Sequence, residues 1–81
     1  MRLNGFLPAE ATSGDMRIVL TAQRALLVEQ HRGLLSFDPS CIRLRTGNGY
    51  LTVGGCALAL SAYGAQDAAI TGQIQRLEFT P

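Results

Sequence analysis

A run of polar residues interrupts the apolar stretch LLVEQHRGLLSF of residues 26–37. Glu29, His31 and Arg32 could do acid–base chemistry, because a carboxylate can orient an imidazole that acts as a general base and a guanidinium can hold an anion. His31 is the one histidine of the chain, so a catalytic imidazole would have to be this one. A polar cluster at the end of a strand is also typical of a turn, with Gly33 supplying an unusual φ. We predict that residues 29–33 form a hairpin connection and not a catalytic group.

The sequence lacks the other spacings that carry chemistry. Two cysteines and one histidine form neither Cys-x-x-Cys nor His-x-x-x-His, so we expect no metal and no cofactor. The glycine stretch TGNG joins two strands and does not precede a helix, as a phosphate-binding loop would. The carboxylates of Glu29, Asp38 and Glu78 have no spacing that enforces proximity, and Asp38 followed by Pro39 and Ser40 predicts a turn. We therefore expect that the protein is not an enzyme and has no small-molecule substrate.

The composition indicates one small domain that gains from association. A chain of 81 residues buries a small share of its surface, while 47% apolar and 16% charged residues rule against disorder. The net charge of +1 argues against a nucleic-acid or membrane partner held by bulk charge. The sequence near the amino terminus has neither the apolar length of a signal peptide nor that of a membrane span. We expect a cytoplasmic homo-oligomer in which Cys41 and Cys56 are thiols.

The elements that would position these residues are β-strands. From Met16 onward apolar residues alternate with period two, and turn residues interrupt them every few positions. We expect residues 1–15 to be a tail with a turn of helix over Pro8–Thr12, and residues 16–81 to be a single all-β domain. The predicted strands are 16–21, 24–31, 33–38, 41–46, 49–54, 57–62 and 69–79.

Short connections predict that successive strands are antiparallel neighbours. The fold class is a small antiparallel meander that forms a sandwich or an open barrel. A short β-solenoid-like stack is the alternative, because GYLTVGGCALAL and AAITGQIQRLEF share a loose rhythm.

Two details of the strand register can be predicted. A type I′ turn at Asn48-Gly49 would place Leu44 opposite Val53, and the same register would bring Cys41 level with Cys56. Ile74 and Leu77 can share one face of the last strand only if a bulge lies near Gln75 and Arg76.

Residues 16–37 are apolar on both faces of the predicted sheet, so a second sheet from the same chain or another copy must cover them. The surface residues that we expect to make contacts are Val19, Leu27 and Leu34, with Arg43 and Arg45 as outward polar contacts and His31 and Arg32 as further contacts to a partner. The residues assigned to the inner side are Ile18, Leu20, Leu26, Val28, Leu35 and Phe37. An alternative function is an oligonucleotide- or ligand-binding barrel that uses Arg43, Arg45, Tyr50 and Tyr63.

Several stretches together resemble the YabP/YqfC family of sporulation proteins, over roughly residues 7–79. Residues 29–33 are similar to an acid-polar-His-basic-Gly stretch of the YqfC branch, although Gln30 stands where the family more often has asparagine. The other matching pieces are Leu7–Glu10, Phe37 and Asp38 with Ile42, the Gly-x-Leu-x-Val-x-Gly strand of residues 49–55, and the closing Ile-x-Gly-x-Ile-x-x-Leu-x-Phe of residues 70–79.

The resemblance implies a mother-cell protein connected with the envelope of the developing endospore, with no enzymatic activity and no cofactor. Combined with the composition, it predicts a module that associates with itself or with another sporulation protein at a membrane. Such a protein would be cytoplasmic, on the mother-cell side, and peripheral to a membrane through its partner.

Overall fold

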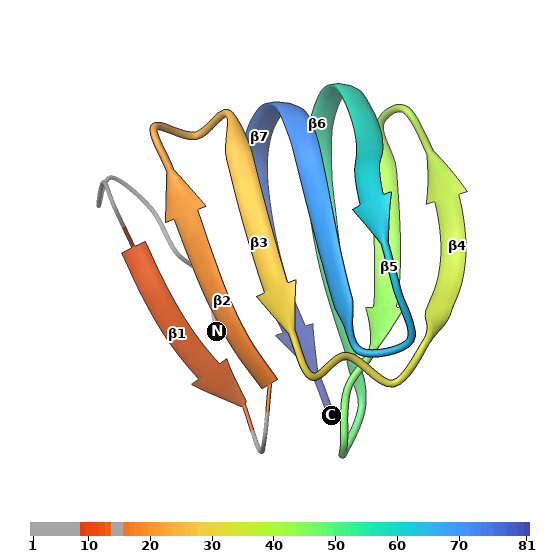
Figure 1. Ribbon diagram of the computed structural model, residues 1–81. Coiled ribbons are helices and arrows are strands. Elements are labelled where there is room, and N and C mark those ends of the chain that lie inside the picture. The colour runs from red at the N-terminus through yellow and green to blue at the C-terminus, as the bar shows by residue number, and fades with distance from the viewer. Residues whose placement is uncertain (1–8, 14–15) are drawn as a thin grey trace.

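The structure is a computed structural model that describes residues 9–13 and 16–81. Seven antiparallel strands form one sheet in this part of the chain, in the order β1-β2-β3-β7-β6-β5-β4, and its described residues contain no helix (Figure 1). The all-β prediction is confirmed, and the stacked-solenoid alternative is wrong because every neighbouring pair is antiparallel. The strands are β1 (Ala9–Ser13), β2 (Met16–Thr21), β3 (Ala25–Glu29), β4 (Leu34–Asp38), β5 (Cys41–Arg45), β6 (Tyr50–Tyr63) and β7 (Asp67–Thr80).

The amino-terminal segment adds a strand that the sequence pattern does not predict. Ala9–Ser13 forms β1 and pairs with β2, from Ala9 opposite Leu20 to Ser13 opposite Met16. The helical turn expected over Pro8–Thr12 is therefore wrong for residues 9–12, while the rest of the predicted tail lies outside the described residues. Among the described strands β1 is bonded to β2 alone, so it forms one edge of this sheet.

Two meanders, β1-β2-β3 and β4-β5-β6-β7, are joined by a connection that crosses one end of the sheet (Figure 1). The predicted hairpin over residues 29–33 is wrong, because β3 pairs with β7 and not with β4. Five residue pairs join these strands, from Ala25 opposite Thr71 to Glu29 opposite Asp67. Of the strands that the structure describes, only β5 pairs with β4, which forms the second edge of the sheet.

The long strands β6 and β7 bend in the middle. The strands predicted separately over 49–54 and 57–62 are continuous in β6, with register shifts at Gly54/Gly55, Cys56/Ala59 and Leu60/Ala62. At the second shift Ala57 has a φ of 54°, and Gly72 opposite it has a φ of 129°. Positive φ costs glycine little, so Gly72 allows the close approach of the two backbones. The β2–β3 turn docks at this bend, where the Gly72 N–H donates to the Arg24 carbonyl at 3.1 Å.

The predicted bulge of the last strand is confirmed. Gly54 lies opposite Arg76 and Gly55 lies opposite Ile74, which leaves Gln75 as the extra residue. Ile74 and Leu77 are both buried as a result.

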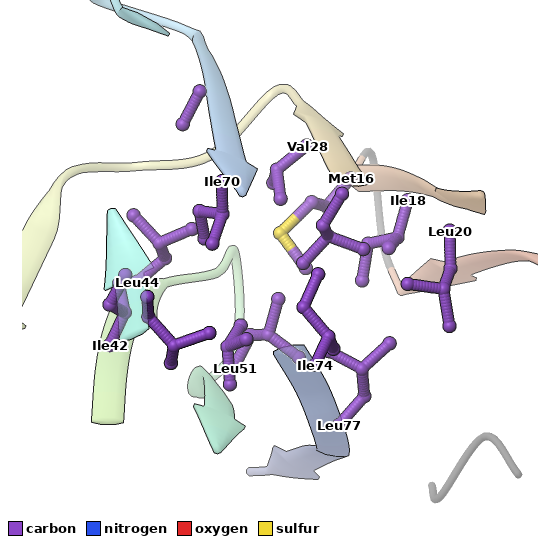
Figure 2. Close-up of a cluster of buried hydrophobic side chains, with 14 residues drawn as sticks. Met16, Ile18, Leu20, Val28, Ile42, Leu44, Leu51, Ile70, Ile74 and Leu77 are labelled. Atoms are coloured by element: carbon purple, nitrogen blue, oxygen red, sulfur yellow. The ribbon is translucent and has the colours of Figure 1, made fainter. Parts of the chain in front are cut away.

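Inner-face side chains from β2, β3, β5, β6 and β7 meet in one apolar core, around which the sheet curls (Figure 2). The inner positions predicted for Ile18, Leu20, Leu26 and Val28 are confirmed. The core residues are Met16, Ile18, Leu20, Leu26, Val28, Ile42, Leu44, Leu51, Val53, Leu58, Ala68, Ile70, Ile74 and Leu77.

The β5–β6 turn differs from the predicted type I′ hairpin by two residues of register. Leu44 lies opposite Leu51 instead of Val53, and the turn spans residues 46–49, with the Thr46 N–H donating to the Gly49 carbonyl at 2.9 Å. The Thr46 hydroxyl accepts the Asn48 N–H at 3.3 Å, which favours this wider turn. Cys41 consequently faces Gly54 and not Cys56, and both cysteines are free thiols.

Candidate functional site

The crossing connection, residues 30–33, is held by backbone hydrogen bonds on both of its sides. Gln30 turns the chain out of β3 with a φ of 67°. The His31 N–H then donates to the Gln66 carbonyl in the β6–β7 turn at 3.0 Å. On the other side the Arg32 N–H donates to the Arg45 carbonyl, and the Arg45 N–H donates to the Gly33 carbonyl, both at 2.8 Å. The connection therefore ties the β6–β7 turn to the end of β5.

The His31 side chain lies inside the fold and uses both ring nitrogens. The Gly33 N–H donates to Nδ1 at 3.0 Å, and Nε2 lies 3.0 Å from the Gly64 carbonyl oxygen. Since a carbonyl only accepts, Nε2 carries the proton and Nδ1 is the acceptor. The residue is 2% exposed, and its ring stacks on Tyr63 with 5.1 Å between the centroids. His31 is therefore buried and not at the surface, and it links the crossing connection to the end of β6. We call His31 with its contacts Gly33, Tyr63 and Gly64 the His31 joint.

The polar run around His31 does not assemble a catalytic group. Glu29 forms a largely exposed ion pair with Arg17 at 3.0 Å and is not the acid that holds the imidazole. Among the described residues, no three His, Cys, Asp or Glu side chains are close enough to hold a metal ion. A hollow of about 450 Å³ beside the connection offers no carboxylate; it is lined by Gln30, His31, Arg32, Gly33, Ala65 and Gln66.

The turn predicted at Asp38 is confirmed. One Asp38 carboxylate oxygen accepts the Ser40 hydroxyl at 2.7 Å and the Ser40 N–H at 2.9 Å. These two hydrogen bonds, the one from the hydroxyl being the larger effect, lower the pKa of the Asp38 carboxyl below its usual value. The carboxylate therefore shapes the β4–β5 turn.

The predicted contact residues fall on separate surfaces. Val19 and Leu27 lie opposite one another on the outer face of β2 and β3, where Leu27 is 42% exposed. Leu34 begins β4 at the far edge of the sheet, and Arg43 and Arg45 point outward from β5. Arg32 is exposed on the crossing connection. The structure does not bring these side chains into one site.

The four residues of the alternative oligonucleotide-binding barrel are not assembled either. The Arg43 guanidinium lies 5.6 Å from the centre of the Tyr50 ring, a cation–π pair on the outer face. Tyr63 belongs to the His31 joint instead, and its hydroxyl accepts the Leu34 N–H at 3.1 Å.

An apolar edge is the feature that the sequence pattern misses. Leu35 and Phe37, predicted on the inner side, are 44% and 48% exposed, because β4 is the last strand of the sheet in the described part of the chain. The register shift between Leu34 and Ser36 also places Leu34, predicted outward, on the inner face in the place of Leu35. All five residues of β4 are exposed, including the large apolar Leu34. We call this strand, with Leu34, Leu35 and Phe37, the β4 edge. Three large apolar side chains within four positions were the available signal, since a solvated edge strand usually carries charged residues.

These features define a small all-β domain with an apolar edge strand, whose conspicuous histidine is a structural joint. A family model described as the YabP family matches residues 12–81, and the chain belongs to that family. The family is associated with sporulation and is not a known enzyme family. No curated protein and no solved structure matches the chain. No helix of the described residues is long and apolar enough to cross a membrane.

Proposed function

We propose that this chain is a non-enzymatic sporulation protein that acts as a self-associating module in the development of the endospore envelope. The observation that carries the proposal is the β4 edge, a strand whose five residues are all exposed and include three large apolar side chains. Membership of the YabP family supports the sporulation part, and the use of both His31 ring nitrogens in the fold supports a role without catalysis.

The mechanism is passive association through burial and strand addition. A free strand edge presents backbone groups that another strand can pair with, and the exposed apolar side chains add the hydrophobic term. Leu34, Leu35 and Phe37 each have more than a third of their surface exposed, so a partner strand would remove apolar area from water on both faces.

The finer placement within sporulation rests on the resemblance to the family. Residues 29–33 support the YqfC branch, because their order of acid, polar, histidine, basic and glycine residues matches that branch. We infer a protein on the mother-cell side of the developing spore, with a membrane-bound sporulation protein as the second kind of partner.

Sedimentation across a wide range of protein concentrations tests the self-association. We expect the wild type to form a defined oligomer, and a Leu34→Glu, Phe37→Glu variant to remain a folded monomer. Leu27→Glu is the matched comparison. Leu27, which the sequence also predicts as a contact residue, is similarly exposed but lies on the outer face of β3, so its variant distinguishes that surface from the β4 edge. A compact wild-type monomer at every concentration would refute self-association. A different protein would then be the expected partner of the β4 edge.

A further inference from the structure

We propose that the β4 edge pairs with the β4 edge of a second copy, antiparallel, about a two-fold axis between Leu35 and Ser36. This geometry places Leu34 opposite Phe37 of the partner subunit, twice in the dimer. It rests on the proposed self-association and specifies its surface, its symmetry and its register.

The bulge in β4 gives this edge its unusual pattern. Leu34 lies opposite Leu44 and Phe37 lies opposite Ile42, and both partners on β5 are buried in the core. Residues three apart on a regular strand point to opposite faces, but the register shift between Leu34 and Ser36 brings Leu34 and Phe37 to the inner face together. The inner side of the edge strand therefore continues the apolar surface of the core.

This pattern selects one register for a symmetric pair. Directly opposite residues of antiparallel strands point to the same face, so an inner residue must lie opposite an inner residue. An axis through Leu35 or through Ser36 would place Leu34 opposite Ser36 or Asp38, which belong to the outer face. An axis between Leu34 and Leu35 would place Phe37 opposite Arg32. An axis through Leu34 or through Phe37 would place that residue opposite its own copy and would leave the other inner residue without an apolar partner. The axis between Leu35 and Ser36 is the one that pairs both inner apolar residues.

A second copy fits the β4 edge better than an unrelated strand. An isologous interface requires a surface that is complementary to its own copy. In this register Leu34 of each subunit packs on Phe37 of the partner subunit, which meets that requirement. Within β4 there is neither lysine nor proline, the residues that most often protect an edge, and Asp38 is its one charged residue. Asp38 would lie opposite Gly33 of the partner subunit, next to the cationic Arg32 of the partner subunit and not to another carboxylate.

One hydrogen bond of the single chain is exchanged in the pair. The Leu34 N–H donates to the Tyr63 hydroxyl at 3.1 Å in the single chain and would have to leave it for a partner strand. Pairing transfers this donor to the backbone of the partner subunit, and the exposed Tyr63 hydroxyl returns to water. Leu34 and Phe37 of the partner subunit are then a hydrogen-bonded pair, which makes Leu35 and Ser36 of the partner subunit the closer, non-hydrogen-bonded pair.

Cysteine cross-linking of the full chain tests the register. In a Cys41→Ser, Cys56→Ser background, Leu35→Cys protein is mixed with Ser36→Cys protein and oxidised mildly, and the linked peptides are identified by mass spectrometry. We expect the mixed 35–36 disulfide to dominate over links within either protein alone, because opposite side chains at such a pair are close enough to bridge. A Leu27→Cys protein in the same background is the control and should not cross-link.

A second measurement separates the two proposals. Phe37→Glu should raise the dimer dissociation constant by roughly tenfold or more, and Leu27→Glu should leave it unchanged. A dimer seen by sedimentation that lacks the 35–36 link, or that Leu27→Glu breaks instead, would overturn the β4 pairing and leave self-association standing. A wild-type monomer at all concentrations would overturn both.

Discussion

Replacement of Gly72 by alanine tests the bend of the β6–β7 hairpin. Gly72 has a φ of +129°, and the strain of holding a residue with a Cβ there is about 1–2 kcal/mol. The added Cβ would lie 2.5 Å from the Ala57 carbonyl oxygen and 3.0 Å from the Leu58 Cα. Both atoms are backbone, so the bulged strand must shift, for roughly another 1–3 kcal/mol. The smaller entropy of the unfolded alanine chain offsets about 0.4–1 kcal/mol, so we expect the free energy of unfolding to fall by about 2–4 kcal/mol.

Thermal and urea unfolding followed by circular dichroism measure this loss, which corresponds to a fall in Tm of roughly 10–30 °C for a domain of this size. Gly33→Ala is the matched control, because Gly33 has the same φ of +129° and an added Cβ would have nothing within 4 Å. It should show the backbone strain alone, about 1 kcal/mol after the entropy offset. Equal losses in the two variants would refute the contact with Ala57, and an unchanged Gly72→Ala protein would refute the bend.

Two further predictions concern polar groups. His31→Phe keeps a ring against Tyr63 but leaves two backbone partners of the imidazole unpaired, so the free energy of unfolding should fall by about 2–4 kcal/mol in urea titrations; a loss below about 0.5 kcal/mol would show that water replaces the imidazole. The hydroxyl and N–H of Ser40 lower the pKa of Asp38, so its contribution to stability is present above the ordinary pKa and is lost as the pH falls through the lowered value. The Tm difference between wild type and Asp38→Asn should therefore shrink in strong acid, and a difference that grows on acidification would contradict this sign.

Alternation in the sequence predicts which face a residue occupies but not which strand lies beside it. It correctly predicts the burial of Ile18 and Val28 on β2 and β3. The same alternation would be satisfied by β4 or by β7 as the next neighbour of β3, and short connections favour the wrong choice. The wrong neighbour also explains why Phe37 is predicted to be buried. As the edge strand, β4 has a neighbour on one side only, so its inner-face residue Phe37 stays exposed.

The strand register is likewise only partly predictable from the alternation of apolar residues. A bulge at Gln75 can be predicted because one extra residue moves Leu77 to the other face, which the apolar pattern detects. The shift of two residues at the β5–β6 turn leaves every face unchanged, so the pattern cannot detect it, and Leu44 lies opposite Leu51 without any contradiction in the sequence. The role of His31 is also invisible, since its Nε2 partner, the Gly64 carbonyl, lies 33 positions further along the chain.

The buried joint at His31 and the free edge at β4 are consecutive in the chain, and this adjacency affects how variants should be interpreted. Gly33, whose N–H donates to Nδ1, immediately precedes β4, and Leu34 is bonded to the tyrosine on which the imidazole stacks. A His31 substitution that abolishes function would therefore resemble the loss of a catalytic base, although its direct effect is to release the start of the edge strand. An assay of the His31→Phe variant well below its Tm distinguishes the two causes. If the variant is inactive because its edge strand is misplaced, it should associate again at low temperature. If it is inactive because a catalytic base is absent, the fully folded variant should remain inactive.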